Sequence, residues 1–218
     1  MTYAKLLASA FILLISFSAE AQLFGKYIGA TLIMQDQTEK EGYIKSSMKA
    51  GSKSVKYKES LEGDAKEIPS EKIDYIIFSN GDSYFAVKHA SWKQFNAKGT
   101  KSKIHKKKMW VSVIETCEGI EIYEDFVTVK PKKDKLVYEY CLGGHNIYLK
   151  KDDEKVITMV ALSMSSIDPN KKGPMGTKKY QKRILAKYFE NDPAALKVLG
   201  DQNITYNLLS EAAQSLCI

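Results

Sequence analysis

The stretch EIPSEKIDYIIFSNGDSYFAVKH, residues 67–89, decides the fold class. Two runs rich in β-branched and aromatic residues flank Asn80-Gly81, a pair that favours a type I′ turn because both residues tolerate positive φ. The stretch therefore predicts an antiparallel hairpin in which Ile77 lies near Tyr84. Both faces of this hairpin are apolar, so we expect one face on the main core and a second element covering the other.

Short segments of the same kind lie on both sides of this hairpin, separated by polar connections. They are YIGATLIMQDQT, EGYIKSS and SVKYKES before it, and MWVSVIET, IEIYEDFVTVK, KLVYEYC, NIYLKK and VITMVALS after it. About ten strands at this spacing predict antiparallel hairpins that form a sandwich or a partly open barrel over residues 22–163. We expect the polar interval 90–108 to be a long loop or a boundary between two β units of this body.

The pattern changes after Ser163, where a Pro/Gly linker covers residues 164–176. Residues 177–218 then predict a helical C-terminal region with two to three short helices. KKYQKRILAKYFE carries an apolar stripe at helical spacing, and NITYNLLSEAAQSL predicts a last helix. Between them, Asp192-Pro193 and Gly200 have the residue types that begin and end a short helix. The expected fold class is therefore mainly β with a C-terminal helical tail.

The N-terminal stretch LLASAFILLISFSAEAQ, residues 6–22, has the features of a secretory signal. A short segment with one Lys precedes an apolar run, and Ala19 and Ala21 have the small-x-small spacing of a cleavage site. The run is shorter than the roughly 20 residues that a membrane-spanning helix needs. We therefore expect residues 1–21 to be removed and the mature chain to be exported, periplasmic or extracellular, without a transmembrane segment.

Three segments of the mature chain carry a family resemblance. TLIMQDQTEKEGYIKSS, KEIPSEKIDYIIFSNGDSYFAV and ILAKYFENDPAALKVL, together with the signal ending AEAQ, resemble exported β-rich proteins of unknown function from Bacteroidota-type Gram-negative bacteria. The resemblance covers most of the mature chain and rests on hairpin turns and a capped helix. It implies export and a β-rich shape. It supplies no reaction, cofactor or catalytic residue.

The chain is basic, and almost all of its positively charged residues are lysines. The formal net charge is +7, and Arg183 is the only arginine. Because arginine is the usual residue for bidentate recognition of phosphates and bases, nucleic acid is an unfavourable partner. The segment KGTKSKIHKKK, residues 98–108, is the strongest charge feature, and we call it the basic tract. Its candidate anion-binding residues are Lys101, Lys103, Lys106, Lys107 and Lys108.

Two interpretations of the basic tract stay open. It can bind an anionic polysaccharide or another anionic polymer by releasing counterions, with Trp92, Phe95 and Trp110 as stacking faces. It can equally be a solvated loop whose neighbouring aromatic residues belong to the core, and like-charge runs favour this second interpretation.

The cysteines are candidates for one disulfide, since an exported chain meets an oxidising compartment. They are Cys117, Cys141 and Cys217, and three cysteines allow three different single pairs. Cys141 and His145 form the only close Cys/His pair. A zinc site needs a second such pair, so we expect no metal and no cofactor.

Carboxylates near one hairpin are the best candidates for catalysis. Glu115, Glu118, Glu121, Glu124 and Asp125 lie close together in the sequence, and glycosidases use two carboxylates across a cleft. The simpler interpretation is a polar outer face that balances nearby lysines. We therefore expect an exported soluble binding or structural module of the cell envelope, with an envelope protein or anionic polysaccharide as partner. A carboxylate-dependent hydrolase of an envelope or dietary polymer is the alternative.

Overall fold

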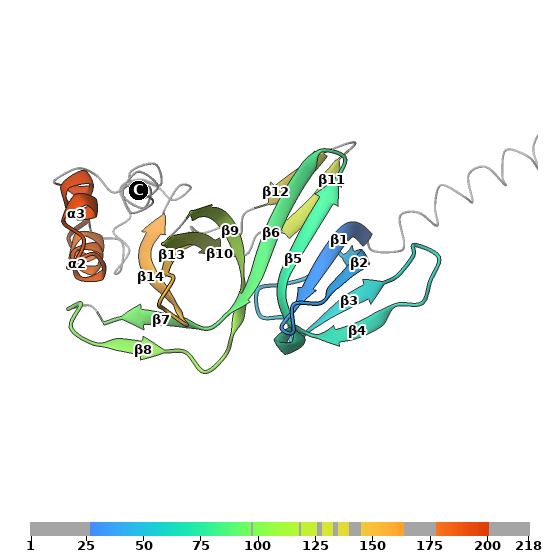
Figure 1. Ribbon diagram of the computed structural model, residues 1–218, viewed down its shortest axis with the longest axis horizontal. Coiled ribbons are helices and arrows are strands. Elements are labelled where there is room, and N and C mark those ends of the chain that lie inside the picture. The colour runs from blue at the N-terminus through green and yellow to red at the C-terminus, as the bar shows by residue number, and fades with distance from the viewer. Residues whose placement is uncertain are drawn as a thin grey trace, which may run out of the picture.

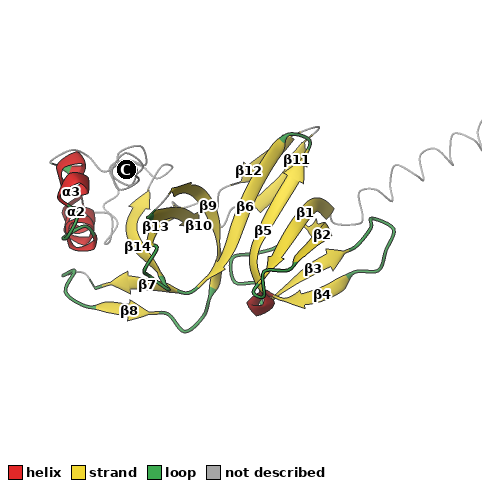
Figure 2. Ribbon diagram, viewed as in Figure 1, coloured by secondary structure: helices red, strands yellow, loops and turns green. Residues whose placement is uncertain are grey.

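The computed structural model describes residues 27–96, 98–117, 119–125, 128–132, 135–139, 145–163 and 178–200. These residues form strands, one 3-10 helix and two α-helices (Figures 1 and 2). The strands are β1 (Tyr27–Met34), β2 (Glu39–Lys45), β3 (Ser54–Lys58), β4 (Lys66–Pro69), β5 (Ile73–Asn80), β6 (Ser83–Ala90), β7 (Trp92–Phe95), β8 (Ser102–Ile104), β9 (Met109–Cys117), β10 (Ile120–Asp125), β11 (Thr128–Lys132), β12 (Lys135–Glu139), β13 (His145–Lys151) and β14 (Ile157–Ser163). The helices are η1 (Ser70–Lys72), α2 (Lys178–Tyr188) and α3 (Pro193–Leu199).

The expected fold class, mainly β with C-terminal helices, is confirmed. The described residues contain fourteen strands, more than the ten or so expected. The additional strands include β7 and β8, which lie inside the polar interval 90–108. That interval is a hairpin rather than a long loop. Its residues lack apolar alternation because both strands lie at one end of the sheet.

Twelve strands form one open sheet in the order β4-β3-β2-β1-β5-β6-β9-β10-β13-β14-β7-β8. Neighbouring strands run antiparallel, apart from the parallel pair β14–β7. The remaining pair, β11–β12, forms a small second sheet beside β5 and β6 (Figure 1). We refer to β1–β6 as the N-terminal strands and to β7–β10, β13 and β14 as the C-terminal strands.

The C-terminal strands curl because one segment of chain borders them on both sides. β7 follows β6 after the single residue Ser91, and β6 pairs with β9 while β7 pairs with β14. The Ile157 N–H donates to the Ser91 carbonyl at 3.0 Å, which fixes the bend. The sheet itself stays open, with β4 and β8 at its two edges.

The C-terminal strands bury side chains on both faces, as strand alternation allows. On β13, Ile147 and Leu149 face helices α2 and α3, whereas Tyr148 lies in a separate cluster on the opposite face. Figure 1 shows the two helices at the end of the molecule farthest from β3 and β4. The core of the N-terminal strands contains Leu32, Ile44, Ile73, Ile76, Phe78 and Val87, together with Trp110 from β9.

The predicted central hairpin is present as β5–β6, but its register differs from the prediction. Ile77 pairs with Ala86, and Tyr84 pairs with Ser79. The turn residues are Gly81 and Asp82, and of these Gly81 alone has positive φ, at 58°. Glycine at the first central position is the pattern of a type II′ turn, so the turn is centred one residue later than a type I′ turn at Asn80-Gly81.

The C-terminal helices follow the predicted signals over the residues described. Asp192 precedes α3, Pro193 is its first residue, and Gly200 follows its end with a φ of 33°. The signal segment 1–21, the linker 164–176 and the predicted last helix lie outside the described residues. Within the described part of the chain, no helix is long and apolar enough to cross a membrane.

Candidate functional site

The basic tract occupies the β8 edge of the sheet and the loop that leads to β9. Lys101 immediately precedes the edge strand and Lys103 lies on it, and Lys106, Lys107 and Lys108 follow in the loop. All five side chains are exposed. None of the five has a side-chain hydrogen bond or ion pair in the described structure. By contrast, Lys88, Lys93, Lys150 and Lys151 each have a carboxylate partner.

Local hydrogen bonds hold the β7–β8 hairpin in shape. In its turn, the Asn96 side chain accepts from the Thr100 N–H at 3.0 Å, and Gly99 has a φ of 71°. On β7, the Lys93 ammonium pairs with Glu154 at 2.7 Å. The sequence therefore places the lysines of the basic tract on an ordered hairpin and its adjoining loop.

The aromatic residues near the basic tract pack against other side chains of the protein. Trp110 is fully buried, and Phe95 packs against the cluster that contacts α2 and α3. Trp92 stacks on His105 with ring centroids 3.5 Å apart, and it meets the Tyr148 ring edge-on. The hypothesis that these rings offer stacking faces to a ligand is therefore wrong for Trp110, whereas Trp92 and Phe95 are half-buried and pack partly against the core.

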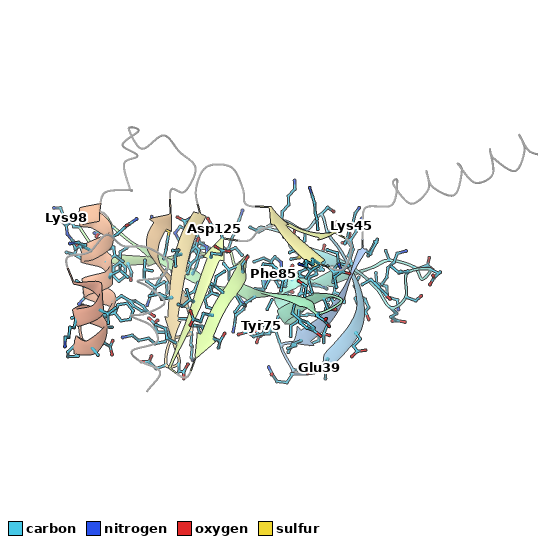
Figure 3. All side chains as sticks on the ribbon, turned by 90° about the horizontal axis from the view of Figure 1, so that it is seen from above. Glu39, Lys45, Tyr75, Phe85, Lys98 and Asp125 are labelled. Carbon is cyan, nitrogen blue, oxygen red and sulfur yellow. The ribbon has the colours of Figure 1, made fainter. Side chains whose placement is uncertain are left out.

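A second polar site centres on Glu121 of β10, between the N-terminal and C-terminal strands. Lys150 donates to the Glu121 carboxylate at 2.9 Å, Tyr75 donates at 3.2 Å, and Tyr123 also donates to it. The Lys88 ammonium donates to the Tyr75 hydroxyl and lies 4.2 Å from the centre of its ring. Figure 3 shows Tyr75 in the space between the two sets of strands.

Burial and charge shift the pKa values in this network. Burial raises the pKa of Glu121, but hydrogen bonds from Tyr123 and Lys150 outweigh it, so the pKa lies below its usual value. Burial lowers the pKa of Lys88 and, together with the Glu121 charge, raises the pKa of Tyr75. The prediction that Glu121 lies on a polar outer face is wrong, because its side chain is only 14% exposed. Its partners hold the carboxylate in an ion network that joins strands.

Asp125 has a similar structural role at the end of β10. Its carboxylate accepts from the Tyr148 hydroxyl at 2.7 Å and from the Asn146 backbone and side-chain N–H groups, each at 2.9 Å. All three donors come from β13. Asp125 therefore ties β10 to β13 and keeps Tyr148 oriented in the core.

Glu124 is buried on the face of β10 opposite to Glu121 and Asp125, with 8% of its surface exposed. Burial, reinforced by the charge of Asp125, raises its pKa to about 7. It borders a hollow of about 440 Å³ at the place where β6 and β9 separate, since their pairing ends at Val87 and Ser112. We call this the β6–β9 hollow; its lining residues are Ile77, Tyr84, Phe85, Ala86, Val113, Ile114 and Glu124.

Of the other predicted carboxylates, Glu115, Glu121 and Asp125 do not line the β6–β9 hollow. Among the described residues that line it, Glu124 is the only acid. Glu115 lies on β9, and Glu118 lies outside the described residues. Within the described chain, no group of three or more His, Cys, Asp or Glu side chains is arranged to hold a metal ion.

The disulfide hypothesis stays a prediction. Cys117 ends β9, where its backbone pairs with Ile120. Cys141 and Cys217 lie outside the described residues, as does the side chain of His145.

No direct signal for the Glu121 network is present in the sequence, because its members are far apart along the chain. Alternation places Lys88 on one face of β6, but it does not show that the sheet bends to bring β10 close to Tyr75. Comparison with known proteins adds no assignment: no family model, curated protein or solved structure matches this chain.

Proposed function

We propose that the protein is an exported soluble module of the cell envelope that binds its partner through the basic tract. The observation that carries this proposal is the contrast between two groups of lysines. Lys88, Lys150 and Lys151, which are partly buried, are paired with carboxylates, whereas the five of the basic tract are exposed at one edge without an acidic partner. Lysines that form no ion pair within the protein can bind an anionic partner.

Export supplies the context of the proposal and has its own test. The full chain is expressed in a Gram-negative host, and mass spectrometry is applied to the protein from the periplasm and the medium. We expect a mature chain that begins at Gln22. An intact Met1 on protein recovered only from the cytosol would contradict the export half of the proposal.

Binding is tested by sedimentation of the purified mature chain with isolated cell envelopes at low and physiological salt. The variant K106Q/K107Q/K108Q removes three charges from the basic tract. We expect it to lose at least about tenfold in retention, because counterion release makes such binding depend steeply on the number of cations. The matched control is K49Q/K53Q/K56Q, which removes three exposed lysines from the N-terminal strands and their loops. Equal retention of both variants would refute the role of the basic tract.

The alternative, a carboxylate-dependent hydrolase, has one observation in its favour. Glu124 has a pKa of about 7 beside a hollow, which suits a general acid near neutral pH. The two-carboxylate mechanism requires a second acid across the hollow, and the described lining supplies none. The binding module is therefore the function that the geometry supports better.

A further inference from the structure

In the described sheet, the edge strand β8 has backbone groups that pair with no other strand. The His105 N–H donates to the Trp92 carbonyl, and the Asn96 N–H donates to the Lys101 carbonyl, each at 2.9 Å. Hydrogen-bonded and non-hydrogen-bonded pairs alternate in an antiparallel ladder, so the backbone groups of Lys103 point toward β7. The N–H and C=O groups of Ser102 and Ile104 therefore point away from β7. No strand of the described sheet lies on that side of β8.

The opposite edge of the same sheet is blocked. Ser70 donates to the Lys53 carbonyl at 2.9 Å, so the same alternation makes Glu67 and Pro69 the residues of β4 whose backbone faces outward. Pro69 has no N–H to offer, and Glu67 adds a negative charge. Proline is a common means of protecting an edge strand. The β8 edge has neither a proline nor an acid.

The side chains around β8 define the chemistry of a matching strand. Lys101, Lys103 and His105 alternate onto one face of the hairpin, and Lys106 follows immediately. On the other face, Ile104 is 60% exposed. A strand laid against β8 would place its residues beside cations on one face and beside an apolar side chain on the other.

We propose that β8 accepts an acidic, extended peptide segment as an additional strand of the sheet. This inference rests on the proposed binding function and names the class of its partner. The peptide backbone pairs with Ser102 and Ile104, and its carboxylates lie beside Lys101, Lys103 and Lys106. Backbone pairing gives the affinity of such an edge complex, and the side chains give its specificity. An anionic polysaccharide would use the same lysines without the backbone groups, which makes the two partners experimentally distinct.

The test uses the mature protein and a fluorescein-labelled peptide that alternates Glu and Val. Fluorescence anisotropy measures its affinity at low and physiological salt. A second peptide has the same sequence with its alternate amides N-methylated, which removes donors for strand pairing and keeps every charge. We expect the methylated peptide to bind at least about tenfold more weakly.

Two protein variants complete the design. Ser102→Pro removes an outward N–H and keeps every lysine, and proline is tolerated where the N–H of an edge strand faces solvent. Glu67→Pro is the matched control, because it removes an outward N–H from the β4 edge. We expect Ser102→Pro to weaken peptide binding at least about tenfold and Glu67→Pro to leave it unchanged, with far-ultraviolet circular dichroism confirming that both variants fold.

The possible results separate the proposals. Tight binding that is lost on methylation and in Ser102→Pro supports strand addition. Equal binding of both peptides would overturn it in favour of a simple anion-binding surface, even if Ser102→Pro failed to fold. If neither peptide bound, the proposal would be overturned, and the lysines would serve only to keep other chains from pairing with the β8 edge. If envelope sedimentation still depended on the basic tract in either case, the proposed function would stand without a peptide partner.

Discussion

Glu121 and Glu124 lie three residues apart on β10, and their surroundings shift their pKa values in opposite directions. Hydrogen bonds from Tyr123 and Lys150 outweigh burial and lower the pKa of Glu121. Glu124 is buried beside Asp125, and its pKa rises to about 7. Strand alternation is the cause of the difference, since it turns the two side chains to opposite faces of the sheet.

The shift at Glu124 makes stability depend on pH near neutrality. The folded chain holds this proton up to about pH 7, whereas the unfolded chain releases it near pH 4.5. The free energy of unfolding therefore falls as pH rises through this window, by up to about 3 kcal/mol at 1.36 kcal/mol per pKa unit. We predict that Glu124→Gln removes this loss in urea unfolding between pH 5 and pH 8. Exposed Glu67→Gln is the control, and unchanged pH dependence in Glu124→Gln would refute the prediction.

The shift at Glu121 acts in the acidic range, and Glu154 behaves in the same way. Both pKa values lie below the usual 4.5, so both groups stabilise the fold fully above pH 4.5. This contribution is lost as pH falls through the folded-state values. We predict a cooperative loss of tryptophan and tyrosine near-ultraviolet circular dichroism below about pH 4.5 in the wild type. The double variant Glu121→Gln/Glu154→Gln should have a flatter acid profile; a profile as steep as that of wild type would contradict the assignment.

At the scale of elements, the Glu121 network joins β5 and β6 to β10 and β13. We predict that Glu121→Gln costs about 1–3 kcal/mol of unfolding free energy, because it leaves the partly buried Lys150 without its counter-charge and removes the carboxylate to which Tyr75 and Tyr123 donate. The control is Glu59→Gln, which breaks the exposed Lys66–Glu59 pair and should have no measurable effect. Urea unfolding at pH 7 measures both, and an equal effect of the two substitutions would contradict a structural role for the network.

Lys151 attaches the C-terminal helices to the β13–β14 hairpin. Its ammonium contacts the Asp192 carboxylate and the Tyr188 carbonyl, and it lies 5.2 Å from the centre of the Tyr188 ring. We predict that Lys151→Met speeds amide hydrogen exchange in α2 and α3 at least about fivefold and leaves β1–β6 unchanged. Lys187→Met breaks the exposed pair with Glu190 and is the control. Uniformly faster exchange in Lys151→Met would show that the helices do not open separately.

The elements also show what the sequence could and could not predict. Alternation identified β1, in which every second side chain is buried, and apolar content identified β5 and β6, which contribute Ile76, Phe78 and Val87 to the same core. The β7–β8 hairpin was missed because the exposed edge strand β8 carries no apolar alternation. The observed turn lies one residue later than the predicted one, because Asn80-Gly81 and Gly81-Asp82 are both acceptable turn pairs. The Glu121 network joins β5 and β6 to β10 and β13 across the intervening β9, and no local pattern encodes that approach.

At the scale of the whole molecule, the lysines differ in role according to where they lie. Lys93, Lys150 and Lys151 are paired with carboxylates, and the lysines of the basic tract collect at one end of the sheet. The opposite edge ends in Pro69. The two edges of one sheet therefore differ in both backbone and charge, and the proposed acidic partner rests on this asymmetry.

The most direct test of this account is an amide hydrogen-exchange map of the mature protein with and without isolated cell envelopes. We expect slower exchange in residues 98–108 when envelopes are present, and unchanged exchange around the β6–β9 hollow. Protection of residues 84–86 and 113–114 without protection of the basic tract would contradict it and would place the function at Glu124.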